Sequence, residues 1–329
     1  MEYVIGIDGG GTSTIGLLAD LEGNIYFQSR NGPSNFHVVG LDEATSVIRK
    51  VIEDLMAGIS YPSAPVKAIC LGLAGVDTEK DAELMKKQVE SLNVAKLVYV
   101  VNDTEIALIG GVGSEHGVVV VAGTGSAAFG CDGKGHKVHA GGWGWILGDE
   151  GSAFRIGQQG LQAVIRALEG RGEYTRLIDN LIQRWQLHSR DELISALRAR
   201  TWSRSDVASM AEWVAITASN GDNVAQQIMR HAGEELGLLA ISVIRQLQID
   251  GEFRIALTGG VFRAGEIVIE PMKQKVQSIA PSAQLTSPLY PPVLGAVFMA
   301  WRVLGLSLEP ERMANAMNQL SSLSRQNSS

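Results

Sequence analysis

Hydrophobic and polar residues alternate along the chain in blocks that predict an α/β protein. Apolar side chains recur every three or four residues between Leu41 and Met56, which predicts a helix, and a more charged helix is expected at residues 78–91. The first part of the chain also contains five apolar runs typical of strands, at residues 3–7, 14–19, 25–27, 66–73 and 96–101. Three successive strands followed by alternating helix and strand favour layers of sheet and helix.

The opening pattern recurs later in the chain. A strand at residues 117–122, a loop of glycine and hydroxyl residues at 123–126 and a strand at 127–131 repeat the order found at residues 5–24. Such a recurrence predicts two similar domains, each of which presents its loop to a shared cleft.

The remainder of the chain is expected to be mostly helical between residues 151 and 249. A strand at 253–257 then leads to a third glycine turn, Thr258-Gly259-Gly260, and a last helix is expected at 293–304. The polar residues 318–329 are expected to form a disordered tail.

Composition narrows the class of protein. The chain has 329 residues, of which 45% are hydrophobic, and this is too long for one ordinary core. Its net charge of −7, without a basic block, argues against a nucleic-acid partner, and its apolar runs are too short for a membrane span. Cys70 and Cys131 are too few for a disulfide framework, and Met1 leads directly into a strand pattern. We therefore expect a cytoplasmic protein.

The glycine loops differ from two familiar phosphate-binding motifs. A dinucleotide fingerprint would need glycine where Thr14 stands, and a Walker loop would need Ser or Thr where Gly135 follows Lys134. The loops lie instead in predicted hairpins, where successive backbone N–H groups can converge on phosphate oxygens. A single loop of this kind is more often a plain tight turn, but three in one chain favour phosphate binding.

Polar side chains flank these loops. Thr12, Thr124 and Ser126 can donate further hydrogen bonds to phosphate oxygens. Asp8, at the end of the first strand, can hold Mg²⁺ through water. The loops therefore predict a phosphate site with its magnesium ion.

Asp103 is the candidate base for transfer of a phosphoryl group to a hydroxyl. Such a reaction needs one carboxylate that aligns the acceptor and takes its proton. Asp103 follows a predicted parallel strand at its carboxyl end, where α/β sheets place their chemistry. It can equally cap the helix expected from Thr104, so on the residues alone both roles stay open.

The stretch GGWGWILGDEGSA, residues 141–153, is a candidate sugar site. Trp143, exposed beside a cleft, would give a sugar ring a flat apolar partner. Asp149 precedes a helix expected from Gly151, so it either binds a ligand or caps that helix. Asn35 carries an amide that suits sugar hydroxyls, or it lies simply in a loop.

A zinc site is the less favoured interpretation of one further cluster. Cys131, His136 and His139 are spaced like part of a metal site. A fourth ligand is missing and the segment is rich in glycine, which favours scattered polar histidines.

Seven motifs together resemble the BadF/BadG/BcrA/BcrD-type ATPase family, which includes N-acetylglucosamine kinases, within the superfamily of sugar kinases, heat-shock ATPases and actin. They are DGGGT (8–12), GPSN (32–35), LAGVD (73–77), ND (102–103), GTGS (123–126), GGWGWILGDEGSA (141–153) and TGGVF (258–262). Single loops are weakly specific, whereas the ordered set is specific and extends over residues 5–304.

The resemblance implies two ribonuclease-H-like domains with a nucleotide cleft between them, the actin-like ATPase fold. The N-terminal domain would span residues 1–104, and the C-terminal domain would span 105–288 with a helical insertion. A helix within 289–312 would pack back on the first domain. Because family members are often homodimers, we also expect a homodimer.

The resemblance further implies roles for individual residues. ATP would contact residues of the three glycine loops, namely Gly9, Gly10, Gly11, Thr12, Thr124, Gly125, Gly259 and Gly260. The acceptor sugar would contact Asn35, Ser126, Gly142, Trp143 and Asp149. The match to the ND motif favours Asp103 as the base over Asp103 as a cap.

These features predict an ATP- and Mg²⁺-dependent kinase that phosphorylates the 6-hydroxyl of N-acetylglucosamine. Glucosamine and N-acetylmuramic acid are the alternative acceptors. The alternative of another class is an ATP-driven activator or regulator without a sugar substrate. Related activators of dehydratases bridge a dimer through a cysteine-held iron–sulfur cluster, and the positions of Cys70 and Cys131 do not favour that branch.

Overall fold

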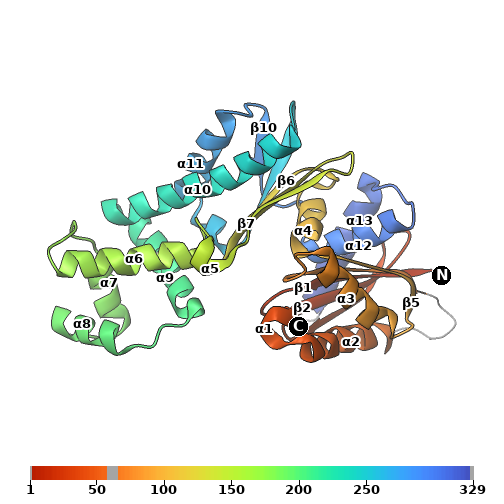
Figure 1. The fold of residues 1–329 in the computed structure, drawn as a ribbon, viewed down its shortest axis with the longest axis horizontal. Coiled ribbons are helices and arrows are strands. Elements are labelled where there is room, and N and C mark those ends of the chain that lie inside the picture. Colours follow the sequence, from red (N-terminus) through yellow and green to blue (C-terminus); the bar gives the residue numbers. More distant parts are fainter. Residues whose placement is uncertain (1, 58–65, 327–329) are drawn as a thin grey trace. The chain divides into compact units, whose positions relative to one another are not determined.

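A computed structural model describes residues 2–57 and 66–326 of the chain. The chain divides into two compact units: unit 1 comprises Met1–Gly117 with Ser287–Ser329, and unit 2 comprises Val118–Thr286. Each unit contains one five-stranded sheet with both parallel and antiparallel pairs, and helices pack on it (Figure 1). The predicted α/β class is confirmed.

The sheet of unit 1 has the strand order β3-β2-β1-β4-β5. Its strands are β1 (Tyr3–Gly9), β2 (Thr14–Asp20), β3 (Ile25–Asn31), β4 (Val66–Leu73) and β5 (Ala95–Asn102). The first three form an antiparallel meander, whereas β4 and β5 run parallel to β1. Gly9 pairs with Leu73 and Leu73 pairs with Asn102, so the parallel strands end at one edge of the sheet.

Helices cover both faces of this sheet. They are α1 (Phe36–Val39), α2 (Leu41–Ala57), α3 (Glu79–Glu90), α4 (Asp103–Val112), α12 (Pro292–Val303) and α13 (Pro310–Gln326). Successive side chains of a strand point to opposite faces. Ile5 and Ile7 accordingly pack with α2 and α3, while Val4 packs with α4 and α12.

Unit 2 repeats this topology with the order β10-β9-β6-β7-β8. Its strands are β6 (His116–Ala122), β7 (Ser126–Asp132), β8 (Lys137–Gly141), β9 (Phe253–Thr258) and β10 (Ala283–Thr286). Its helices are α5 (Gly144–Leu147), α6 (Ala153–Leu168), α7 (Leu177–Arg184), α8 (Arg190–Ala199), α9 (Arg204–Ser219), α10 (Asn223–Leu247), the 3₁₀ helix η1 (Gly260–Ala264) and α11 (Glu266–Gln277). The strands β6 to β10 therefore occupy, in turn, the positions of β1 to β5.

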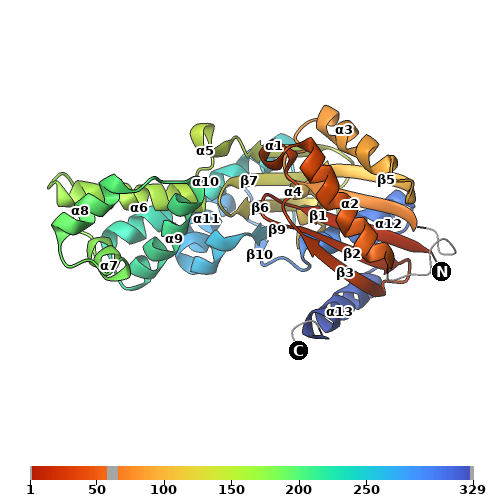
Figure 2. The same ribbon diagram turned by 90° about the horizontal axis from the view of Figure 1, so that it is seen from below.

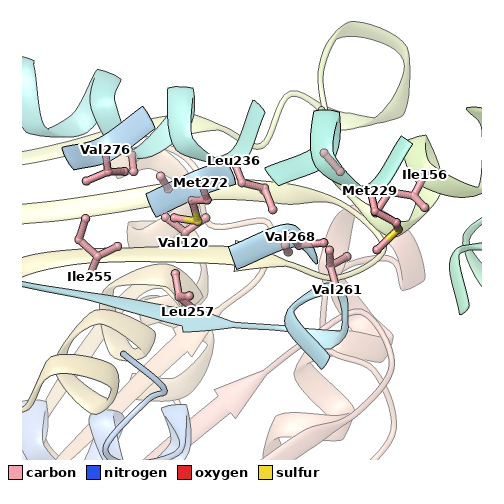
Figure 3. Close-up of a cluster of buried hydrophobic side chains, with 14 of the residues drawn as sticks. Val120, Ile156, Met229, Leu236, Ile255, Leu257, Val261, Val268, Met272 and Val276 are labelled. Atoms are coloured by element: carbon pink, nitrogen blue, oxygen red, sulfur yellow. The ribbon is translucent and has the colours of Figure 1, made fainter. Parts of the chain in front are cut away.

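The core of unit 2 lies between its sheet and the helices α10 and α11 (Figure 3). Val120 from β6 and Ile255 and Leu257 from β9 pack in one cluster with Leu236 of α10 and Met272 of α11. Burial of each such side chain stabilises the fold by about 1.5–3 kcal/mol. Helices α10 and α11 thus pack against one face of the sheet and stabilise the strands that carry the loops at its edge.

The expectation of a disordered tail at residues 318–329 is wrong for residues 318–326, which continue α13. Met313, Ala316 and Leu320 are buried at helical spacing and join the core of unit 1, and α13 lies beside β3 (Figure 2). This buried stripe outweighs the polar composition of the segment. Residues 327–329 lie outside the described part of the chain. Over the described ranges, no helix is long and apolar enough to cross a membrane.

Candidate active site

Two carboxylates of unit 1 have raised pKa values at the edge where the parallel strands end. Asp8 lies in β1, and burial together with the negative charge of Asp103 raises its pKa to about 7. Asp103 follows β5, and burial and then the charge of Asp77 raise its pKa to about 6, although the N–H of Thr104 acts in the opposite direction. A carboxyl group that titrates near neutral pH is suited to accept a proton from a substrate.

The alternative role of Asp103 as a helix cap is wrong, because Asn102 caps α4. The Asn102 Oδ1 atom accepts from the backbone N–H of Thr104 at 3.0 Å and from its hydroxyl at 2.5 Å. The Asn102 Nδ2 atom donates to the carbonyl oxygen of Val76 and to Asp77 Oδ1, both at 3.1 Å. Asn102 therefore ties the loop after β4 to the junction of β5 and α4 and leaves the carboxylate of Asp103 free of the capping task.

The carboxylates at this edge fit a magnesium ion. The charges of Asp8 and Asp103 repel each other, and this repulsion contributes to the raised pKa of Asp8. A divalent cation would offset it, and oxygen atoms with water are the ligands that Mg²⁺ prefers.

Cys131, His136 and His139 were the candidates for a zinc site. The His136 ring contacts Asp132 at 2.7 Å, and Cys131 is buried. Among the described residues, no group of three or more His, Cys, Asp or Glu side chains is arranged to hold a metal ion directly.

Gly9 and Gly11 of the first hairpin have different surroundings. A Cβ atom on Gly9 would lie 2.3 Å from Ser34 Oγ, so packing requires a glycine there. A Cβ atom on Gly11 would meet nothing within 4 Å, and Gly11 is exposed beside the exposed Thr12. Packing within the chain therefore does not account for Gly11.

Asn35 is the N-cap of α1, and its Oδ1 atom accepts from the N–H of His37 at 3.1 Å. A Cβ atom on Gly75 would lie 2.6 Å from that same oxygen. The GPSN loop thus touches the LAGVD loop within unit 1, and Asn35 has a defined capping role beyond that of an ordinary loop residue.

In unit 2, the second and third glycine loops lie side by side. They follow the parallel strands β6 and β9, and a Cβ atom on Gly259 would lie 2.3 Å from the carbonyl oxygen of Ala122. Gly123 donates to the carbonyl oxygen of Gly125 at 2.9 Å, which closes a tight turn with Thr124 exposed at its tip. This edge of unit 2 thereby offers backbone N–H groups and a hydroxyl, the donors that phosphate needs.

Asp149 is buried and held in the left-handed region, with φ of 62°. Its Oδ1 atom accepts from the N–H of Ser126 at 3.1 Å, and its Oδ2 atom accepts from Arg204 Nη2 at 2.7 Å. The alternative role as a helix cap is wrong, because Ser152 caps α6 by accepting from the N–H of Arg155. Asp149 instead links the GDEGS loop (residues 148–152) to the GTGS loop and to the start of α9.

The residues around Trp143 form an exposed apolar surface on unit 2. Trp143, Ile146 and Leu147 are each exposed by 70% or more. Gly142 donates to the carbonyl oxygen of Ser126, the last residue of the GTGS loop, at 2.9 Å. This bond holds Trp143, the next residue in the chain, beside that loop. The Ser126 hydroxyl donates to the carbonyl oxygen of Glu150 at 2.6 Å. Four of the five predicted acceptor residues, Ser126, Gly142, Trp143 and Asp149, thus lie together in unit 2, while Asn35 belongs to unit 1.

Two further residues at these edges, Asp77 and Arg204, carry no role predicted from the sequence. Asp77 lies within the LAGVD motif, and its charge acts on Asp103. Arg204 lies far along the chain in a helical segment that carries no recognisable motif. The motif itself could have directed attention to Asp77, whereas only the folded chain brings Arg204 to Asp149.

Comparisons with known proteins are consistent with these features. The model of the BadF/BadG/BcrA/BcrD ATPase family matches residues 5–300. The chain is 31% identical over 302 residues to the N-acetylmuramic acid/N-acetylglucosamine kinase of Clostridium acetobutylicum, covering 91% of this chain and 98% of the relative. It is 34% identical over 312 residues to the N-acetyl-D-glucosamine kinase of Dictyostelium discoideum, with the same coverage of 91% and 98%.

A solved structure supports the fold. A protein from Chromobacterium violaceum, provisionally described as an N-acetylglucosamine kinase, superposes with a TM-score of 0.70 at 26% identity. The superposition covers 91% of this chain and 98% of that one. The predicted family resemblance and fold are therefore confirmed, and the family description supports ATP as the nucleotide.

Proposed function

The chain belongs to the BadF/BadG/BcrA/BcrD ATPase family, and we propose that within it the protein is an amino-sugar kinase. It transfers the γ-phosphoryl group of ATP to the 6-hydroxyl of N-acetylglucosamine, in the presence of Mg²⁺. Two relatives at 31% and 34% identity are kinases of N-acetylated amino sugars, which supports this acceptor class. The observation that carries the proposal is Asp103, a half-buried carboxylate without a capping task whose pKa is raised to about 6.

In this proposal Asp103 orients the 6-hydroxyl of the sugar and takes its proton as the oxygen attacks phosphorus. A raised pKa makes the carboxylate a stronger base while it remains mostly ionised at neutral pH. Phosphoryl transfer otherwise needs alignment and neutralisation of charge more than covalent help. Asp8 would hold Mg²⁺ through water, and the ion would neutralise phosphate charge when bound.

The nucleotide contacts are proposed from the loops of both units. Gly9, Gly10, Gly11 and Thr12 bind the β- and γ-phosphates, and Thr124 and Gly125 form the second phosphate loop. Gly259 and Gly260 lie by the adenosine. The open space above Gly11 and the exposed Thr124 support these assignments.

The acceptor contacts are proposed to be Asn35, Ser126, Gly142, Trp143 and Asp149. An exposed indole suits the apolar face of a sugar ring, and a carboxylate suits adjacent sugar hydroxyls. We also propose a cytoplasmic homodimer, with unit 1 as one ribonuclease-H-like domain and unit 2 as the other.

A panel assay tests the proposed function. ADP release is measured with ATP and Mg²⁺ against N-acetylglucosamine, glucosamine, N-acetylmuramic acid, glucose and no sugar. The expected result is release that depends on an amino sugar and is fastest with N-acetylglucosamine. Preference for glucosamine or N-acetylmuramic acid would keep the enzyme class and change the acceptor. ADP release at the same rate without any sugar would instead favour an ATP-driven activator or regulator.

A further inference from the structure

The proposed acceptor residue Asp149 is covered in this structure. Its side chain is only 3% exposed, and both carboxylate oxygens already accept a hydrogen bond. One donor is the backbone N–H of Ser126, which belongs to the GTGS loop. The other is the guanidinium of Arg204, the first residue of α9, whose Nη2 atom lies 2.7 Å from Asp149 Oδ2.

This burial conflicts with direct binding of a sugar. A hydroxyl that donates to a carboxylate must approach its oxygen to about 2.5–3.0 Å. No such approach is open while Arg204 covers Asp149. The Ser126 N–H cannot leave without breaking the start of β7, so Arg204 is the group that has to move.

We propose that Arg204 occupies the place of the acceptor sugar and is exchanged for the sugar hydroxyls on binding. This inference rests on the proposed amino-sugar kinase function and adds a positioning residue to it. Arg204 keeps the buried carboxylate of Asp149 paired while no acceptor is bound. Adjacent hydroxyls of the sugar then donate to the carboxylate of Asp149 in place of the guanidinium.

The geometry of the pair makes the exchange feasible. Only one nitrogen of Arg204 contacts Asp149, so the pair lacks the second bond of a bidentate fork. The Arg204 side chain is 43% exposed, so water can solvate the guanidinium as soon as it turns away. Asp149 keeps its bond from Ser126 throughout, and the GDEGS loop therefore stays in place during the exchange.

Gly125 shows how closely the groups fit at this point. A Cβ atom there would lie 2.7 Å from Asp149 Oδ1 and 3.0 Å from Arg204 Nη2. The guanidinium therefore lies directly above the turn that carries Thr124, at the junction of the proposed acceptor and phosphate sites. A residue at this position controls entry to Asp149 without taking part in the transfer itself.

The test measures affinity for N-acetylglucosamine by calorimetric titration in the full-length wild-type protein and in Arg204→Met. If Arg204 has to be displaced, its removal eliminates a competitor, and the dissociation constant falls by about three- to tenfold. Arg204→Lys keeps the charge on a shorter side chain without the planar guanidinium, so its affinity should lie between those of the other two proteins. Tighter binding on loss of a charge partner is a result that a merely structural role of Arg204 does not produce.

Arg200→Met is the matched control. Arg200 lies on the segment before α9, is similarly exposed at 41%, and pairs with Asp206 instead of Asp149. Its removal should leave sugar affinity unchanged, and thermal melts should show that all three variants are folded. If Arg204→Met fails to fold, Arg204→Lys decides the question in the same direction.

Weaker or unchanged sugar binding in the folded Arg204 variants would overturn the exchange. The proposed function is judged separately, on wild-type protein. If the wild type phosphorylates an amino sugar and the Arg204 variants bind it no more tightly, only the exchange is wrong. If the wild type neither binds nor phosphorylates any sugar of the panel, the function and the exchange both fall.

Discussion

The two sheets share one strand order, yet their edges carry opposite chemistry. In unit 1, acidic side chains lie at the ends of all three parallel strands: Asp8 in β1, Asp77 after β4 and Asp103 after β5. In unit 2, two of the three matching strands, β6 and β9, end in glycine loops, and Asp149 beside the first of these loops is paired with Arg204. One repeated scaffold thus keeps the proposed proton transfer and the proposed recognition of substrate on separate sheets.

The physical basis of this difference is charge balance. Unit 1 brings carboxylates together in a buried setting, which raises the pKa values of Asp8 and Asp103 to about 7 and 6. Unit 2 presents backbone N–H groups and hydroxyls, which carry no net charge and suit phosphate and sugar. Mutations that affect only one edge therefore separate the two proposed roles.

The largest expected effect comes from removing the base. Asp103→Asn should lower the turnover number by about 10²–10⁴-fold, because the substitution removes the proposed general base. Sugar and ATP affinities, measured by calorimetry, should change little. Asp250→Asn, on the exposed surface of unit 2, is the control and should turn over normally. Near-normal turnover in Asp103→Asn would remove Asp103 from the mechanism.

A smaller effect should follow from changing the recognition edge. Asp149→Ala removes the carboxylate that is proposed to accept from sugar hydroxyls, so sugar affinity should fall by about ten- to a hundredfold. ATP affinity should stay nearly constant. The melting temperature should also fall, because the Ser126 N–H loses its partner. A variant with lower stability but normal sugar affinity would reduce Asp149 to a structural link.

The first hairpin allows a matched pair of substitutions. Gly11→Ala adds a Cβ atom where the chain has nothing within 4 Å, so stability should be unchanged while ATP affinity falls by about tenfold. Gly9→Ala adds one 2.3 Å from Ser34 Oγ, and such overpacking costs about 1–3 kcal/mol of stability. Thermal melts and nucleotide titrations of both variants distinguish the two roles. Full ATP affinity in Gly11→Ala would contradict the phosphate assignment of that loop.

The smallest expected effect is a shift of the pH profile. Asp103 must be deprotonated to act as a base, so turnover should fall as the pH drops through about 6. Asp77→Asn removes a negative charge that raises the pKa of Asp103, and it keeps an Oδ1 acceptor for Asn102. The acidic limb of the profile should therefore move to lower pH, by less than about one pH unit. An unmoved limb would show that Asp77 does not act on the base.

Stability provides a second readout of the same carboxylates. The folded-state pKa values of Asp8 and Asp103 are raised, so the folded chain binds more protons than the unfolded chain between about pH 4 and 7. Their contribution to stability is present at low pH and is lost as the pH rises through 6 and 7. Asp8→Asn should make the melting temperature less dependent on pH in this range.

The sequence by itself determined the elements with strong local signals. Alternation and run length predicted β1 to β5, and glycine hairpins between apolar runs predicted the repeat that the two sheets share. These features depend on neighbours within a few residues, which is why they can be read without the fold. The role of each loop residue in binding stays a prediction.

The edge strands of unit 2 and the end of the C-terminal helix became evident only in the tertiary structure. The sequence pattern does not predict β8 and β10, because edge strands are short and only partly buried. The end of α13 was predicted wrongly, since its helix depends on Met313, Ala316 and Leu320 packing against unit 1. These elements are stabilised by residues far away in the sequence, so local composition does not predict them.

The site shows the same division. The ND and GDEGS motifs mark Asp103 and Asp149, but their local sequence allowed either a cap or a ligand-binding carboxylate. Only the folded chain assigned the caps to Asn102 and Ser152 and raised the pKa of Asp103 by burial. Likewise, only the folding of α9 against the GDEGS loop brings Arg204 onto Asp149, a hydrogen bond across 55 residues of sequence. Hydrogen-bond partners and burial depend on three-dimensional proximity, and a linear pattern does not contain them.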